Sequence, residues 1–450
     1  MQLVYGIKDK PKFPGILVFA LQQLLAILAA TIAVPMIIGH GMSTSAALFG
    51  AGAGTLVYQL FTRFKSPVFL GSSFAFLGSM AAAFGGAVSV SVGFLGLIIG
   101  AAMAGLVYVI IALIVRRFGV EWINKLMPAV VIGPTVAIIG LSLAGNAIGD
   151  LVNHPEQDAN GSYIMGLNAL VCLICGLVTL FTVIFCSIYG KKMAKMIPFI
   201  IGIGAGYAVA AVLTLIGSLT DSAALQIIDF SKFRSMQWYP DFTFLTAFSG
   251  NYDFGTTGNF GAYLGTLAVA YVPVAFVVFA EHIADHKNLS SIIEKDLLED
   301  PGLDKTLLGD GVGSAVGAFF GGCPNTTYGE SVGCVAISGN ASVATITVTA
   351  FMAIVASFIA PFVTLLSTIP ACVMGGVCVA LYGFIAVSGL KMIQKVDLGE
   401  NNNLFTVSVI LIAGIGGLAL KFGKITITSI ACALILGIIT NILGNLKKKN

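Results

Sequence analysis

Two glutamates stand in parts of the sequence that carry no other charge. Glu281 follows the uncharged apolar run 264–280, and Glu330 is the one charged residue within the stretch 323–339. An ionisable side chain inside a bilayer is energetically costly, so its presence indicates a substrate, ion or proton site. Two such residues in one chain predict a polar binding site at membrane depth.

The composition agrees with a membrane location. The chain has 450 residues, of which 57% are hydrophobic and 10% are charged, whereas soluble domains carry about 25% charged residues. A helix crosses a bilayer with about 20 apolar residues, so this length accommodates about fourteen spans with short loops. The net charge of +3 gives no indication of a nucleic-acid partner. Cys172 and Cys175 form a C-x-x-C pair in an apolar stretch, where we expect helix packing and no metal or redox chemistry.

Hydropathy and helix-breaking residues divide the chain into fourteen expected spans. Those of the first half are 14–38, 45–62, 67–84, 89–115, 123–145, 164–187 and 196–217. Those of the second half are 262–286, 306–321, 324–338, 341–366, 369–391, 403–420 and 423–445. The segments 67–84 and 324–338 are short and rich in Gly, Ser, Thr and Pro, so we expect them to be broken spans.

The basic residues predict the orientation. With both termini in the cytoplasm, the cytoplasmic segments hold all but four of the 23 Lys and Arg residues, the exceptions being Lys232, Arg234, Lys421 and Lys424. This bias follows the positive-inside rule and favours an even number of spans. The long polar loop 218–257 then faces outward.

Similar features recur at corresponding places in the two halves. The glycine-rich segments 50–55 and 309–314 are each followed by a proline and a broken span, and Pro128 in the fifth span matches Pro370 in the twelfth. The matching spans lie seven apart, which predicts two inverted repeats, and paired broken spans point to the binding site of a transporter. Chance similarity among glycine-rich helices is the competing interpretation.

Four motifs resemble a known family, the bacterial uracil permeases of the nucleobase:cation symporter-2 (nucleobase–ascorbate transporter) family. They are LGSSFAF at 70–76, FAEHI at 279–283, KDLLEDPGL at 295–303 and PNTTYGE at 324–330. The resemblance extends from about Phe13 to the last helix. It implies an all-α polytopic membrane protein with fourteen transmembrane segments in two inverted seven-segment repeats. Two short antiparallel strands are expected in the broken segments 3 and 10.

The resemblance also implies a division into a core and a gate domain that move against each other. The expected parts are the cytoplasmic N-terminus 1–13, the core domain 14–115 and 258–366, the gate domain 123–217 and 369–445, the extracellular loop 218–257 and the cytoplasmic C-terminus 446–450. Relatives are thought to form homodimers through their gate domains. Compact loops suggest a prokaryotic cytoplasmic membrane.

By resemblance, Glu281 and Glu330 bind the N–H and C=O edge of uracil, since a protonated carboxyl offers one donor and one acceptor in one plane. The backbone N–H groups of Phe74 and Gly329 would bind the carbonyls at the positive ends of half-helices. Ala30 and the Phe74 ring would line the faces of the base. Tyr328 would border the site.

Proton symport is the expected mode of coupling, because burial favours the protonated form of a carboxyl. Glu281 is the first candidate for the proton-linked group. Relatives carry His four residues later, where this chain has Asp285 followed by His286, so either residue could take the coupling role, or Na⁺ could bind there. Tyr382 matches a tyrosine at the core–gate boundary. His282 is expected to be a packing residue, and Asp310 is either a further candidate or the start of its helix.

Three other functions compete with uracil transport. A xanthine or uric acid permease of the same family usually carries Gln-Asn where this chain has Glu330 and Ser331. An anion transporter of the sulfate-permease type shares the fold but would favour a cation in the site. An intramembrane enzyme could use Glu281, His282 and Asp285 as metal ligands, but no H-E-x-x-H motif occurs. We therefore expect no enzymatic activity, no cofactor and no metal.

Overall fold

The computed structural model describes residues 3–119, 121–158, 160–191, 193–250, 260–422 and 425–446. Parts of six sequence predictions lie outside these residues. They are residues 1–2 of the N-terminus, 159 and 192 of the gate domain, 251–257 of the outward loop, 258–259 of the core domain, 423–424 of the last span and 447–450 of the C-terminus.

Helices dominate the described residues. The helices of the first half are α1 (Phe13–Ile38), α2 (Thr44–Phe61), η1 (Phe74–Phe76), α3 (Leu77–Gly85), α4 (Val90–Phe118), α5 (Glu121–Leu126), α6 (Ala129–Ser142), α7 (Ala144–Leu151), α8 (Leu167–Tyr189), α9 (Met193–Met196) and α10 (Pro198–Leu219). The connection between the halves holds η2 (Ala223–Leu225), η3 (Phe230–Ser235) and α11 (Thr243–Phe248). The second half holds α12 (Phe260–Ile293), η4 (Leu298–Gly302), α13 (Leu303–Gly321), α14 (Gly329–Ser338), α15 (Val343–Ala356), α16 (Ala360–Ser367), α17 (Ala371–Ile393), α18 (Asn401–Ile415) and α19 (Ser429–Asn445).

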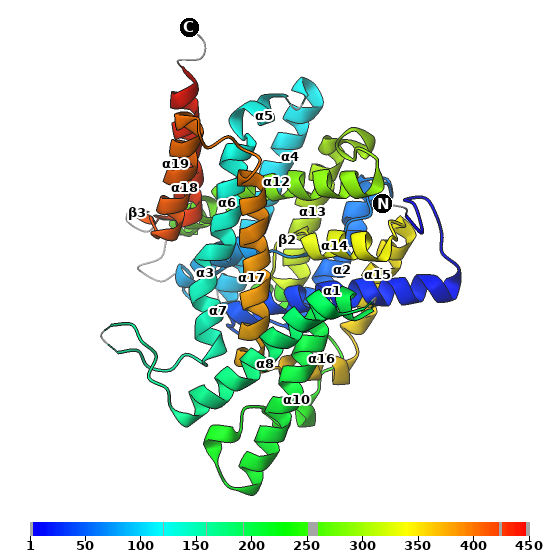
Figure 1. Ribbon diagram of the computed structural model, residues 1–450, viewed down its shortest axis with the longest axis vertical. Coiled ribbons are helices and arrows are strands. Elements are labelled where there is room, and N and C mark those ends of the chain that lie inside the picture. Colours follow the sequence, from blue (N-terminus) through cyan, green and yellow to red (C-terminus); the bar gives the residue numbers. More distant parts are fainter. Residues whose placement is uncertain are drawn as a thin grey trace.

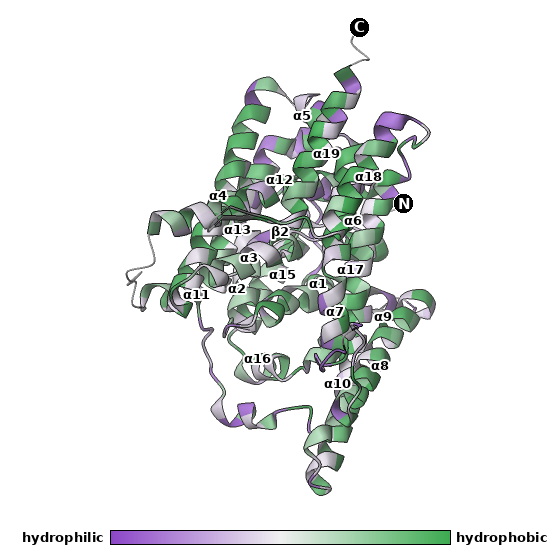
Figure 2. Cartoon of the chain, turned by 90° about the vertical axis from the view of Figure 1, so that its left-hand side faces the viewer, coloured by the Kyte–Doolittle hydropathy of each residue, from purple (hydrophilic) through white to green (hydrophobic). Residues whose placement is uncertain are grey.

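Seven helical stretches in the described part of the chain are long and apolar enough to cross a membrane, and α15 with α16 makes an eighth if they form one span. The number fourteen stays a prediction. Figure 2 shows hydrophobic residues along most of α8 and α10, while hydrophilic residues gather near α5 and the neighbouring loops. The chain is therefore a multi-pass membrane protein.

Three expected spans differ from the observed helices. The segment 341–366 is bent by 84° between α15 and α16, because Pro361 stands in the first turn of α16 and disfavours helical backbone before it. The segment 123–145 is interrupted at Pro128, which caps α6. The helix α12 continues seven residues beyond the expected end at 286, as far as Ile293.

The predicted pair of short strands is confirmed. β1 (Leu70–Ser72) and β2 (Asn325–Thr327) are antiparallel, with Gly71 opposite Thr326. Both strands are fully buried, and β2 lies in the interior of the molecule in both views (Figures 1 and 2). The helix α2 completes the pairing, since its Thr55 Oγ1 accepts from the backbone N–H of Leu70 at 2.9 Å. Extended backbone at membrane depth is tolerated only when its polar groups find such partners.

A second pair of strands was not predicted. β3 (Leu420–Phe422) and β4 (Ile425–Ile427) are antiparallel and separate α18 from α19. The expected segment 403–420 therefore ends as a helix at Ile415, and the last helix begins only at Ser429.

The helices form two groups by their contacts. In the first helix group, α2 contacts α13 and α15, α4 contacts α12 and α13, and α1 contacts α15. In the second helix group, α17 contacts α6, α7 and α8, α10 contacts α8, and α18 contacts α6 and α19. Figure 1 shows α18 and α19 side by side at one edge of the molecule, next to α6.

The matching glycine-rich segments of the two halves meet in the first helix group. A Cβ built on Gly54 of α2 would lie 2.7 Å from the carbonyl oxygen of Gly313 on α13, and a Cβ on Gly313 would lie 2.8 Å from the carbonyl oxygen of Gly54. Small residues let membrane helices approach this closely. The repeated glycines thus bring α2, α13 and the strands between them together.

An ion pair between Lys65 and Asp300 joins the loop after α2 to the loop between α12 and α13. Asp300 accepts hydrogen bonds from Lys295 Nζ at 2.7 Å and from Lys65 Nζ at 2.6 Å. These two lysines lower the pKa of the Asp300 carboxyl to about 2. The loop containing the KDLLEDPGL motif is therefore held against the first helix group.

The glycine contact predicts a specific loss of stability. Replacing Gly54 with Ala should destabilise the protein by about 1–3 kcal/mol, because the methyl group would overlap backbone of α13. Gly204→Ala in α10 is the matched control, since a Cβ there meets nothing within 4 Å. Thermal unfolding of the two purified variants in detergent checks this. Equal melting temperatures would contradict the close contact.

Candidate functional site

A cavity of about 420 Å³ lies between the two helix groups. Its lining comes from α1, the start of η1, α12, β2 and α14 on one side, and from α6, α8, α9, α10 and α17 on the other. Six of the nine predicted site residues line it, namely Phe74, Glu281, Asp285, Tyr328, Gly329 and Glu330. A cavity of this size is typical of small-molecule sites.

The two strands aim helix N-termini at this cavity. η1 begins at Phe74, directly after β1, and α14 begins at Gly329, directly after β2. No side chain caps either N-terminus. The first-turn N–H groups of a helix lack partners within the helix and carry partial positive charge. Both half-helices therefore present donors to the same cavity.

Carboxyl groups reach the cavity from two helices. Glu281 and Asp285 stand one turn apart on α12, and Glu330 is in the first turn of α14. Asp285 Oδ2 accepts a hydrogen bond of 2.7 Å from Thr327 Oγ1 of β2. This bond links α12 to the strand pair, so the carboxyls of the two helices share one framework.

The helix α14 is anchored at its start by Ser331. Gln23 Nε2 of α1 donates to Ser331 Oγ, and the backbone N–H of Phe69 donates to the same oxygen at 3.3 Å. Ser331 is fully buried and does not line the cavity. The Tyr328 hydroxyl donates to the backbone oxygen of Ser72 at 2.8 Å, so this tyrosine also braces the two broken segments.

The other end of α14 is held by the start of the chain. Residues 3–9 form an N-terminal strap, in which Val4 N donates to Gly339 O at 2.8 Å. In return, Ala341 N donates to Tyr5 O at 2.9 Å and Val343 N donates to Ile7 O at 3.1 Å. Ile7 also packs against a small hydrophobic cluster that includes residues of α14. The sequence predicted this segment only as a cytoplasmic end.

Two predicted residues lie next to the cavity without lining it. Ala30 is buried one turn beyond Ala26, which does contribute to the wall. Tyr382 of α17 packs its ring edge-on against Phe74, with ring centroids 5.4 Å apart. Tyr382 therefore lies where the two helix groups meet.

His286 is the third predicted site residue that does not line the cavity. It lies in a buried polar network behind α12. His286 Nε2 is 2.7 Å from the Tyr58 hydroxyl, and His282 Nδ1 is 2.7 Å from Asp310 Oδ2. His282 Nε2 also meets Thr306 Oγ1 at 3.0 Å. All of these side chains are buried. The helix α13 begins at Leu303, so Asp310 lies about two turns inside it and does not mark its start.

Sequence reasoning missed much of the polar lining. Ser73, Ser187, Lys195, Asn288 and Ser388 all line the cavity. In the sequence, Lys195 is one of the expected cytoplasmic basic residues that predict the orientation. Asn288 follows Glu281 by seven residues, which is two helical turns, so helical periodicity could have found it. The other positions depend on how the second helix group meets the first.

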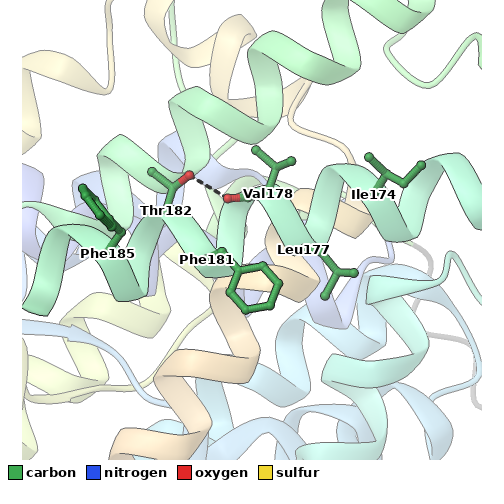
Figure 3. A pocket seen from close by; sticks show the side chains of 6 residues that line it. All are labelled: Ile174, Leu177, Val178, Phe181, Thr182 and Phe185. Atoms are coloured by element: carbon green, nitrogen blue, oxygen red, sulfur yellow. Dashed lines mark hydrogen bonds between the residues drawn. The ribbon is translucent and has the colours of Figure 1, made fainter.

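A second hollow lies on the outer face of α8 and has a different character (Figure 3). Its lining comes from this one helix, and Phe181 and Phe185 are 60% and 63% exposed. Its polar side chain is Thr182, whose hydroxyl donates to the backbone oxygen of Val178 at 2.7 Å. An apolar stripe of this kind is expected on a lipid-facing helix, and we assign it no part in substrate binding.

The N-terminal strap should contribute to the stability of the site. Ile7→Asp would place a charge in the hydrophobic cluster beside α14 and should destabilise the protein by about 1–3 kcal/mol. Thermal unfolding and proteolysis of the N-terminus measure this effect, with Lys8→Ala, an exposed neighbour, as the control. If Ile7→Asp unfolds like the control, the strap does not hold α14.

Curated relatives match almost the whole chain. Residues 14–422 match the family model described as "Permease family". The uracil permease of Bacillus caldolyticus is 37% identical over 443 residues, covering 98% of this chain and 94% of that protein. The uracil permease of Escherichia coli K12 is 32% identical over 437 residues, covering 96% and 92% of the two chains.

Solved structures match the fold. The transmembrane domain of a cyanobacterium bicarbonate transporter, BicA, has a TM-score of 0.63 at 15% identity, covering 97% of this chain and 99% of that one. The murine anion transporter Slc26a9 in its inward-facing state has a TM-score of 0.62 at 14% identity, covering 98% of this chain and 69% of that one. At these identities the likeness concerns the fold alone. By its sequence, the chain belongs to the permease family of nucleobase:cation symporter-2 transporters.

Proposed function

We propose that this nucleobase transporter is a uracil permease that carries uracil into the cell together with H⁺. The observation that carries the proposal is the meeting of two glutamates and two half-helix N-termini in one cavity. The names of the similar permeases support uracil as the substrate. The expected setting is a bacterial cytoplasmic membrane, with both termini inside.

The site chemistry suits a pyrimidine edge. A protonated carboxyl of Glu281 or Glu330 can donate to a ring carbonyl and accept from a ring N–H. The backbone N–H groups of Phe74 and Gly329 supply further donors for the carbonyls. The Ser73 hydroxyl has no hydrogen-bond partner among the described residues, and it also lines the cavity. The ring of Phe74 offers an apolar face for the base.

The clustering of carboxyls supports proton coupling. Three like charges in one small cavity oppose each other, so the ionisation of all three at once is unfavourable. Glu281 and Asp285 are the proposed proton carriers, because both face the cavity from one helix. His286 is a weaker candidate, since its ring is bonded to Tyr58 outside the cavity. Sodium coupling is the alternative.

Transport would follow alternating access. The first helix group would act as the core domain that carries the site, and the second as the gate domain against which it moves. The cavity between them is lined by both groups. Homodimerisation through the gate domains remains part of the proposal.

A purine permease for xanthine or uric acid is the second candidate. Ser331 stands where a purine permease usually has Asn, but its side chain is hydrogen-bonded to Gln23 and to the backbone of Phe69 and does not line the cavity. Glu330, the residue that distinguishes this chain from the purine branch, lines the cavity. This placement favours the pyrimidine substrate.

Removing the carboxyl of either glutamate should weaken recognition of uracil. Glu281→Ala and Glu330→Ala should each lower uracil uptake at subsaturating substrate by about 10- to 100-fold, because both the donor and the acceptor of the carboxyl are lost. Uptake of labelled uracil by proteoliposomes measures the effect. Glu121→Ala, at an exposed position of α5, is the control. Normal uptake by either site variant would refute its assignment.

Asp285 should be needed for coupling to protons. Asp285→Asn should retain uracil exchange but lose accumulation driven by an imposed proton gradient, because the side chain can no longer release a proton. Accumulation is compared at several external pH values, in sodium and in choline salts. Accumulation that keeps its wild-type pH dependence would remove Asp285 from the mechanism, and a requirement for sodium would favour the alternative ion.

A further inference from the structure

The charges that line the cavity are divided between the two helix groups. The carboxyls of Glu281, Asp285 and Glu330 come from α12 and α14, which belong to the first group. Lys195 of α9 is the one basic residue among the described residues that line the cavity, and it comes from the opposite side. The neutral polar residues around it include Ser187, Asn288 and Ser388, and Tyr328 and Cys334 are the other titratable groups in the lining.

The short helix that carries Lys195 is a point of contact between the groups. α9 connects α8 to α10, and it also contacts α1 and α14 of the first group. Immediately after α9, Ile197 packs against Ala26 of α1 and Cys334 of α14. Any movement of one group against the other must open or re-form this contact. Lys195 is exposed and makes no ion pair with another described residue.

We propose that Lys195 is a cationic latch that closes the cavity when it is empty and its carboxyls have released their protons. This inference rests on the proposed proton-coupled transport. A lysine ammonium is a cation at neutral pH, and it attracts a carboxylate but gains little from a neutral carboxyl. The segment 195–197 is therefore drawn to α12 and α14 only after proton release.

The latch accounts for the return of the empty transporter. Removing an unpaired carboxylate from water costs free energy, and a paired cation offsets part of that cost. A closed, empty cavity is therefore more stable when its carboxylates have a cationic partner. When uracil and protons are bound, the carboxyls are neutral or engaged with substrate, and the latch is open. Net uptake needs the empty transporter to return, but exchange of internal for external uracil does not. Lys195 should thus affect net uptake more than exchange.

The experiment compares the two modes in the same proteoliposomes. Net accumulation of labelled uracil is driven by a proton gradient, and exchange is measured as counterflow into vesicles loaded with unlabelled uracil. In Lys195→Met the ratio of net uptake to exchange should fall by about two- to fivefold, the loss expected for an exposed ion pair. Lys195→Arg should restore the ratio. Lys191→Met is the control and should match wild type. Lys191 is an exposed lysine in the same connection between α8 and α10, and it does not line the cavity.

The outcomes separate the latch from other roles. Net uptake and exchange that fall equally would make Lys195 a substrate contact or a structural residue, and a wild-type ratio would show that it has no role; both overturn the latch. Lys195→Gln replaces Lys195→Met if the latter does not fold, as judged by thermal unfolding. If wild type itself shows neither uracil uptake nor exchange, the proposed function fails, whatever the variants do.

Discussion

The structure depends on the pairing of two extended segments in the interior of a membrane protein. Backbone N–H and C=O groups cannot stay unpaired at that depth. β1 and β2 satisfy each other, and the flanking backbone adds bonds from Ser73 N to Pro324 O and from Tyr328 N to Phe69 O. Gly71 is essential to this arrangement, because the Tyr328 ring occupies the space that a Cβ would need. The pairing places the two half-helix N-termini at opposite ends of the strand pair, where both border the cavity, and the binding site follows from it.

The constraint also determines which side of the cavity is rigid. α14 is anchored at one end through Ser331 and at the other by the N-terminal strap. α12 is joined to β2 through Asp285 and Thr327. The groups that would bind the base and the proton therefore belong to one braced unit, while Lys195 approaches from the other. In the proposed transport cycle, moving one unit against the other would change the pairing of charges and leave the geometry of the carboxyls as it is.

The sequence predicted those parts of the fold that local chemistry determines. Apolar runs located the helices, and the prolines at 67 and 324 marked the broken segments. Isolated charges pointed to Glu281 and Glu330, which both line the cavity. It did not predict the bend at Pro361, the strands β3 and β4, or the strap, because hydropathy does not encode which segments pair. The placement of His286 behind α12 and of Lys195 in the cavity depends on helix rotation and on contacts between distant segments, which no single stretch of sequence contains.

The most direct test of the account is uptake of radiolabelled uracil into proteoliposomes under an inward proton gradient, competed with excess xanthine and adenine. The account predicts accumulation that collapses when a protonophore is added and that persists in the presence of the purines. Uptake that ignores the proton gradient would contradict the proposed role of the clustered carboxyls. Uptake that is blocked by xanthine would move the protein to the purine branch.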